Sequence, residues 1–116
     1  MKYGIVVTSS ELGNQSAINF ATELLNSNHT LHRVFFYDEG VNNALESSPN
    51  SSAWKDLHKR HSLDLVVCVT AAKKRGLIAE KDSPLERSPL CNSFVVSGLG
   101  QLADIAAHCD RVITFR

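Results

Sequence analysis

Five short runs of apolar and β-branched residues recur along the chain between stretches of mixed polarity. An unbroken apolar run is typical of a strand buried on both faces of a parallel sheet, whereas a half-exposed strand alternates polar and apolar positions. The pattern therefore predicts five buried strands. They are Tyr3 to Thr8, Thr30 to Tyr37, Leu65 to Val69, Phe94 to Ser97 and Arg111 to Phe115.

The stretch after the first strand has the spacing of an amphipathic helix. We interpret Asn14 as its N-cap, and Asn26-Ser27-Asn28 as its end, because Asn tolerates the left-handed backbone of a C-terminal cap. Between them the apolar residues fall on one helical face. They are Ala17, Ile18, Phe20, Ala21, Leu24 and Leu25.

Three further helices are predicted between the later strands. One covers Ala53 to His61, with Ser51 or Ser52 as its cap, and a short one covers Ala71 to Arg75. The last begins at Ser97-Gly98-Leu99-Gly100 and turns an apolar face toward the sheet. Its apolar residues are Leu102, Ala103, Ile105 and Ala106.

Two segments carry loop rather than helix or strand signals. Val41 to Ser52 is rich in Asn and Ser and predicts a polar loop, with room for one short helical turn and the strongest indication of mobility. Lys81 to Asn92 contains two Ser-Pro turn signals and predicts irregular structure.

Strands that alternate with helices indicate βαβ units, whose right-handed crossovers build a parallel sheet with helices on both faces. The predicted fold class is α/β, a three-layer α/β/α sandwich around a five-stranded parallel sheet. A chain of 116 residues is the usual size of one domain, so residues 1–116 are interpreted as a single domain.

Charge and cysteine usage narrow the function classes. Twelve Lys plus Arg balance twelve Asp plus Glu, so the overall charge predicts no direct nucleic-acid contact and no membrane partner. Cys68, Cys91 and Cys109 are an odd number at wide spacing, which predicts free thiols and no bound metal. The short apolar run at the start predicts neither a signal peptide nor a membrane span, and the expected location is cytoplasmic.

Cys68 is the residue with the clearest chemical potential. It stands at the predicted carboxyl end of a buried strand, where open α/β sheets bind their ligands, and Lys73, Lys74 and Arg75 follow within seven residues. A thiolate is the reactive form of cysteine, and cations and a helix N-terminus favour it. We therefore expect an accessible, anionic Cys68. The alternative is a buried cysteine that acts as a small hydrophobic residue.

Other chemistry has weaker support. Gly98-Leu99-Gly100 and Gly13 do not complete a dinucleotide fingerprint or a phosphate-binding loop, so turn chemistry is the default interpretation of these glycines. Cys91 lies in a predicted loop, where exposure would make it an accessory thiol. Cys109 stands beside Asp110 and before a buried strand, which favours packing, and a neighbouring carboxylate would raise the pKa of its thiol.

Four stretches together give the chain a resemblance to the DsrE/TusD family of small sulfur-relay proteins along nearly its whole length. One of them includes Cys68 at the position of the family's acceptor cysteine, with small residues and a basic pair before Gly76. The first loop departs from the family pattern and keeps only Gly13 of it. The four stretches are Val34 to Asn43, Leu65 to Gly76, Ser97 to Leu102, and Cys109 to Val112 with Phe115.

The resemblance implies a sulfurtransferase in which Cys68 receives a persulfide sulfur from an upstream donor protein and passes it to a downstream acceptor. Lys73, Lys74 and Arg75 would stabilise the anion or steer an acidic partner. The implied assembly is a heterohexamer of related subunits of the DsrEFH/TusBCD kind, and no cofactor is implied. The leading hypothesis is 2-thiolation of the tRNA wobble uridine. The alternatives are intracellular sulfur oxidation and a non-catalytic oligomeric scaffold.

Overall fold

The computed structural model describes residues 1–78 and 90–116, and five strands of the predicted sheet lie within them. The apolar runs identified in the sequence form these strands, and each prediction agrees with the structure to within one residue at either end. The strands are β1 (Lys2–Val7), β2 (Thr30–Phe36), β3 (Leu65–Cys68), β4 (Phe94–Ser97) and β5 (Arg111–Phe115). The third run ends early as a strand, because its last residue, Val69, already belongs to a helix.

Helical segments follow each of the first four strands. Four are α-helices, and a 3₁₀ helix continues directly from the end of β2. They are α1 (Leu12–Asn26), η1 (Asp38–Ala44), α2 (Ser51–His61), α3 (Val69–Lys74) and α4 (Gly100–His108). Within the described residues, every helix is too short or too polar to cross a membrane.

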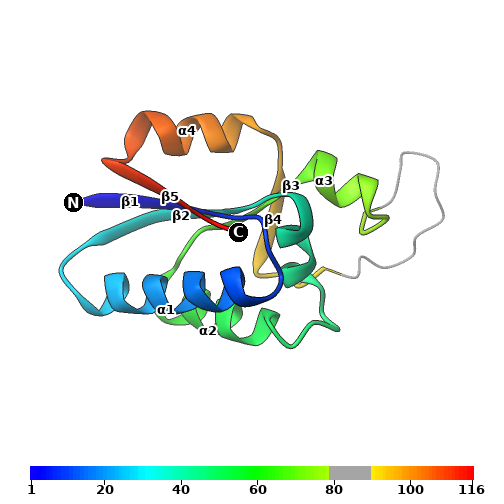
Figure 1. Ribbon diagram of the computed structural model, residues 1–116, viewed down its shortest axis with the longest axis horizontal. Coiled ribbons are helices and arrows are strands. Elements are labelled where there is room, and N and C mark those ends of the chain that lie inside the picture. The colour runs from blue at the N-terminus through cyan, green and yellow to red at the C-terminus, as the bar shows by residue number, and fades with distance from the viewer. Residues whose placement is uncertain (79–89) are drawn as a thin grey trace.

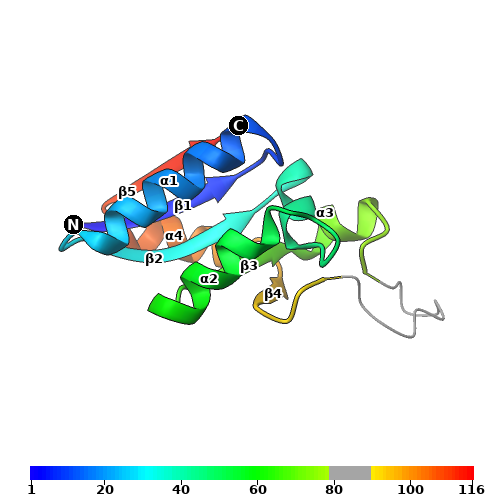
Figure 2. The same cartoon turned by 90° about the horizontal axis from the view of Figure 1, so that it is seen from below.

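The five strands form one parallel sheet in the order β4-β3-β2-β1-β5. The chain steps one way across the sheet from β1 to β4 and then returns over it through α4 to β5. Because right-handed crossovers in opposite directions lie on opposite faces, α1 and α2 share one face and α4 covers the other. Figures 1 and 2 show these layers, with α3 beyond the carboxyl ends of the strands. The α/β/α sandwich predicted from the sequence is confirmed.

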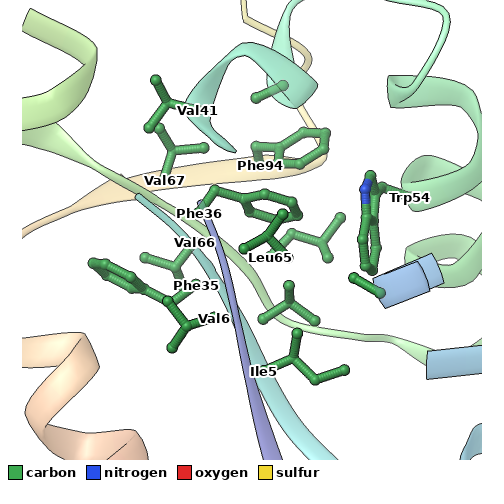
Figure 3. Close-up of a cluster of buried hydrophobic side chains, with 14 of the residues drawn as sticks. Ile5, Val6, Phe35, Phe36, Val41, Trp54, Leu65, Val66, Val67 and Phe94 are labelled. Atoms are coloured by element: carbon green, nitrogen blue, oxygen red, sulfur yellow. The ribbon is translucent and has the colours of Figure 1, made fainter. Parts of the chain in front are cut away.

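The core lies on both faces of the central strands (Figure 3). Residues of even and odd position point to opposite faces, so Phe36 reaches Trp54 of α2 while Phe35 points toward α4. The Phe36 ring also meets Phe94 edge-on at 5.3 Å, which joins β2 to the edge strand β4. Burial on both faces explains why these strands have unbroken apolar sequences.

The start of α1 differs from the prediction. The helix begins at Leu12, and Asn14 lies inside its first turn rather than at its cap. The Asn14 side chain is 1 % exposed, and its Oδ1 accepts a hydrogen bond from Trp54 Nε1 at 2.7 Å. An Asn near the start of a helix predicts a cap from the local sequence alone. Here the side-chain oxygen of Asn14 instead accepts a hydrogen bond from Trp54, which is distant in sequence.

The segment after β2 is more ordered than a polar loop. Val41, Asn43 and Ala44 of η1 are completely buried. Asn43 Nδ2 donates to the carbonyl oxygens of Ser9 and Gly40, which ties η1 to the loop after β1. A Cβ on Gly40 would overlap the Val7 carbonyl oxygen, so this close approach requires glycine. The short helical turn allowed for in this segment is therefore present as η1, and its buried side chains pack against the loop after β1 rather than facing solvent as a polar loop would.

Two smaller predictions are also corrected or left open. Helix α2 begins at Ser51 after Asn50, and neither Ser51 nor Ser52 caps it, because the Ser51 hydroxyl donates back to the Ser48 carbonyl. The irregular segment expected from Lys81 to Asn92 lies mostly outside the described residues. Its described end, Leu90, forms an isolated antiparallel bridge with Leu45.

Candidate functional site at the carboxyl end of β3

Cys68 is the last residue of β3 and directly precedes the first residue of α3. The strand ends here because the backbone turns from extended geometry at Cys68 into the helix at Val69. This confirms the predicted position at the carboxyl edge of the sheet, next to a helix N-terminus. The side chain, however, is completely buried. The expected accessible thiol is therefore not found in this conformation.

The neighbours of Cys68 come from the two adjacent strands. Ser97 of β4 is its register partner, so both side chains point to the same face of the sheet, toward the α4 layer. On the other side, Tyr37 follows β2 and stacks on Phe35, whose row also faces α4. Neither Ser97 nor Tyr37 was predicted as a site residue, because strand register cannot be deduced from one sequence. Their positions at the ends of apolar runs were the available signal.

The three predicted cations lie at the far end of α3 from the thiol. Lys73 and Lys74 belong to its last turn and Arg75 follows it. A helix rises ~1.5 Å per residue, which places Arg75 roughly 9 Å along the axis from Val69. The cations therefore do not surround the sulfur as expected from their closeness in sequence. They form a cluster at the C-terminal end of α3.

A cavity of about 210 Å³ opens between η1 and α3 at this edge. Arg75 Nη2 donates to Asp38 Oδ1 at 2.6 Å across its margin. The cavity reaches the first turn of α3, two residues beyond Cys68, and carries two cations against one carboxylate. Its lining residues are Tyr37, Asp38, Thr70, Ala71, Lys74 and Arg75.

Asp38 occupies an unusual backbone conformation at this site. Its φ is 53°, in the left-handed region that non-glycine residues rarely adopt and that Asp and Asn tolerate best. It begins η1, so the turn out of β2 aims its carboxylate toward α3. In the sequence Asp38 falls within the family-like stretch Val34 to Asn43, and the structure adds its contact with Arg75.

The other two cysteines are separate from this site. Cys91 is 3 % exposed, and its backbone N–H donates to the Ala44 carbonyl at 2.8 Å, so the possibility of an exposed accessory thiol is not supported. Burial raises the pKa of the Cys109 thiol, with smaller contributions in the same direction from Asp104 and Asp110. Cys109 contacts the Gly4 region of β1, in agreement with the packing role predicted for it.

Of the glycines considered for nucleotide binding, only Gly13 lies where a side chain would not fit. A Cβ on Gly13 would overlap the Arg116 carbonyl, so glycine permits α1 and the end of β5 to approach. Gly98 and Gly100 have open space around them. A larger hollow of about 640 Å³ lies beside α2, between residues such as Lys55 and Ser93. It does not include any residue proposed for thiol chemistry.

Fold and site define a small α/β protein with one thiol at the carboxyl edge of its parallel sheet, beside a short basic helix. The DsrE/DsrF-like family model matches residues 1–115, and the chain belongs to this family. The resemblance noted in the sequence is thus confirmed.

Relatives of known name cover the whole chain. Proteins named "Sulfurtransferase TusD" from Salmonella newport and Salmonella paratyphi A are 44 % identical to it, over 99 % of this chain and all of each relative. The class predicted from the sequence, a sulfurtransferase, is the one that these relatives carry.

Two solved structures share the fold. The ychN protein from E. coli superposes with a TM-score of 0.70 at 20 % identity, covering 99 % of both chains. MTH1491 from Methanobacterium thermoautotrophicum gives a TM-score of 0.72 at 16 % identity, covering 97 % of this chain and 96 % of its own. These likenesses support the α/β architecture.

Proposed function

We propose that this chain is a sulfur-relay sulfurtransferase in which Cys68 carries the sulfur. The observation that carries the proposal is the place of Cys68, which ends β3 at the carboxyl edge of the sheet and directly precedes α3. Active groups of open α/β proteins lie at this edge, in the crevice outside the carboxyl ends of the strands. Family membership and the sulfurtransferase names of the relatives support the same chemistry.

The proposed reaction needs no cofactor. The Cys68 thiolate attacks the outer sulfur of a donor persulfide, a new S–S bond forms on Cys68, and the donor's S–S bond breaks to release the donor as a thiolate. An acceptor thiolate then attacks the outer sulfur of the Cys68 persulfide and releases Cys68. Each step exchanges one S–S bond for another, so electrons balance without an oxidant. Lys74 and Arg75 beside the cavity would attract an acidic partner.

The finer assignment is 2-thiolation of the tRNA wobble uridine. In it the chain is one subunit of a TusBCD-like heterohexamer and the tRNA itself is handled by later carriers. A role in intracellular sulfur oxidation uses the same chemistry with other donors and acceptors. Thionucleoside analysis of tRNA from cells that depend on this chain separates the two roles. Loss of the 2-thiouridine in a Cys68→Ser strain supports the first role.

A non-catalytic scaffold subunit is the second candidate, and the complete burial of Cys68 favours it. It predicts a chain that binds its sister subunits but never takes up sulfur. The relay predicts both binding and uptake. Co-purification and sulfur loading, measured on one preparation, therefore decide between them.

Sulfur loading is tested by incubation with a persulfidated donor protein and mass spectrometry of the peptides. One added sulfur atom is expected on the Cys68 peptide of the native chain and none on the corresponding peptide of the Cys68→Ser variant. Cys91→Ser and Cys109→Ser are matched controls, and both should still load. An added sulfur that persists on the Cys68→Ser chain, at Cys91 or Cys109, contradicts the assignment.

A further inference from the structure

Because the proposed carrier thiol is sealed in the folded chain, sulfur transfer requires that something uncover it. We propose that the Arg75–Asp38 ion pair is a latch that holds α3 over Cys68, and that an acidic segment of a partner protein opens it by taking Arg75 from Asp38. This inference rests on the proposed function of Cys68. It adds the regulation of the site and the chemical class of the partner surface.

Helix α3 is the element best suited to move. It has six residues, far fewer than the roughly 12 to 15 at which an isolated helix becomes even marginally stable, so its position depends on contacts with the rest of the fold. Ala71 and Ala72 supply small buried side chains, and η1 packs against the helix. Elements with few buried apolar contacts open at a lower free energy than the whole domain.

The ion pair connects the two elements that must separate. Arg75 follows the end of α3 and Asp38 is the first residue of η1, and their 2.6 Å contact joins two residues that line the cavity. The hinge on which α3 would turn is the junction of Cys68 and Val69. Helix α3 follows Cys68 directly, so in the proposed movement the backbone next to the thiol moves with the helix, and the cavity, which already reaches Thr70 and Ala71, widens toward Cys68.

The latch is weak enough for a partner to exchange. The Arg75 side chain is 27 % exposed and that of Asp38 is 60 % exposed, so solvent screens their attraction. A carboxylate from a partner can replace the Asp38 carboxylate with little net change in free energy, because Arg75 exchanges one ion pair for another. Lys74 lines the same cavity and adds a second positive charge toward the incoming chain.

The first test measures how fast iodoacetamide, an uncharged reagent, alkylates Cys68 in the full chain, resolved by mass spectrometry of its peptide. Asp38→Asn removes the charge and keeps a residue that tolerates the φ of 53°. Loss of an exposed ion pair of this kind should raise the alkylation rate about two- to fivefold. Asp56→Asn, which breaks the exposed Asp56–Arg60 pair of α2, is the matched control and should leave the rate unchanged.

Two internal measurements separate opening of α3 from other effects. Cys91 is buried elsewhere, so its alkylation rate in the same sample reports global unfolding and should not rise. Hydrogen exchange of the Gly76 and Leu77 amides, which bond to α3 carbonyls, should accelerate in parallel with Cys68 alkylation. Unchanged alkylation of Cys68 in Asp38→Asn, or faster alkylation without faster exchange, overturns the latch.

The second test adds hexaglutamate or hexalysine peptides at equal ionic strength. Hexaglutamate should speed alkylation of Cys68 in the native chain and have no further effect in Asp38→Asn, whereas hexalysine should not speed it in either. Equal effects of the two peptides overturn the acidic partner. Sulfur loading is a separate measurement: a working latch with no loading refutes the proposed function, and loading with no latch refutes this inference.

Discussion

Ser97 of β4 lies directly opposite Cys68 of β3 in the parallel register, on the same face of the sheet. A persulfide adds one sulfur atom to a side chain that is already completely buried. The extra atom must therefore displace a neighbouring group, and Ser97 is the register partner on the β4 side. The hydroxymethyl group of Ser97 is small, so it takes up little of the space on the β4 side of the thiol.

Filling this space should block sulfur loading. We predict that Ser97→Leu lowers the rate of persulfide formation on Cys68 about tenfold. A tenfold change corresponds to about 1.4 kcal/mol, within the roughly 1–3 kcal/mol that overpacking typically costs. Ser97→Ala should load normally. Mass spectrometry after incubation with a persulfidated donor measures both, with Ser93→Leu, at the hollow beside α2 and not paired with Cys68, as a control. Equal loading of Ser97→Leu and the native chain would show that the sulfur enters from another side.

The hydrogen bond from Trp54 Nε1 to Asn14 Oδ1 should stabilise the contact between α1 and α2. Both side chains are buried, so Asn14→Ala leaves the indole N–H without a partner in an apolar setting. The expected loss in the free energy of unfolding is about 1–3 kcal/mol. Denaturant titration measures it. Gln15→Ala, which removes an exposed bond to Asn19, should change the free energy by far less.

Most of the fold could be predicted because burial leaves a direct mark on composition. Val34, Phe35 and Phe36 are apolar without alternation because helices cover both faces of β2. Errors arose where a residue's partner is distant in sequence. Asn14 looks locally like a cap, and η1 looks like a polar loop because nothing in the local sequence reveals that Asn43 is bonded to the loop after β1.

The site was predictable in position but not in arrangement. Cys68 at the end of an apolar run is a local feature, so its place at the edge of the sheet follows from the strand. Its burial depends on neighbouring strands that are distant in sequence, such as β4 with Ser97, and the pairing of Arg75 with Asp38 joins residues 37 positions apart. Closeness in sequence suggested that the cations surround the thiol. In the structure the whole length of α3 separates them from Cys68.

The carboxylate of Asp104 should make the attachment of α4 dependent on pH. Hydrogen bonding from His32 holds the pKa of Asp104 below its ordinary value of 3.8, with the charges of His108 and Arg33 adding to this effect and burial opposing it. The folded state therefore favours the ionised form. Its stabilising effect is present above pH 3.8 and is lost as the pH falls through the lowered pKa of the folded chain.

Asp104→Asn tests this dependence. The variant should unfold more easily than the native chain at neutral pH, and the difference in free energy of unfolding should shrink as the pH falls below 3.8. Denaturant titrations over a series of pH values measure it, with Asp56→Asn as an exposed control. A difference that stays constant down to the lowest pH would mean that Asp104 acts through packing rather than charge.

Gly76 should control both the stability of α3 and the cover over Cys68. Its φ is 68°, and the helix ends there with Gly76 N–H bonded to the Lys73 carbonyl and Leu77 N–H to the Ala72 carbonyl. This pair of hydrogen bonds forms a Schellman cap, which needs a left-handed residue at that position. Gly76→Ala has free space around its Cβ, so its cost is the strained backbone alone, about 1–2 kcal/mol.

Because that cost falls on the last turn of α3, it should also uncover the thiol. We predict a several-fold faster alkylation of Cys68 in Gly76→Ala, with Cys91 unaffected. Gly100→Ala is the matched control: it lies in open space without a positive φ, and helix propensity makes it neutral or slightly stabilising. If Gly76→Ala loses stability but alkylates at the native rate, α3 frays at its end without lifting from Cys68, and the hinge must lie elsewhere.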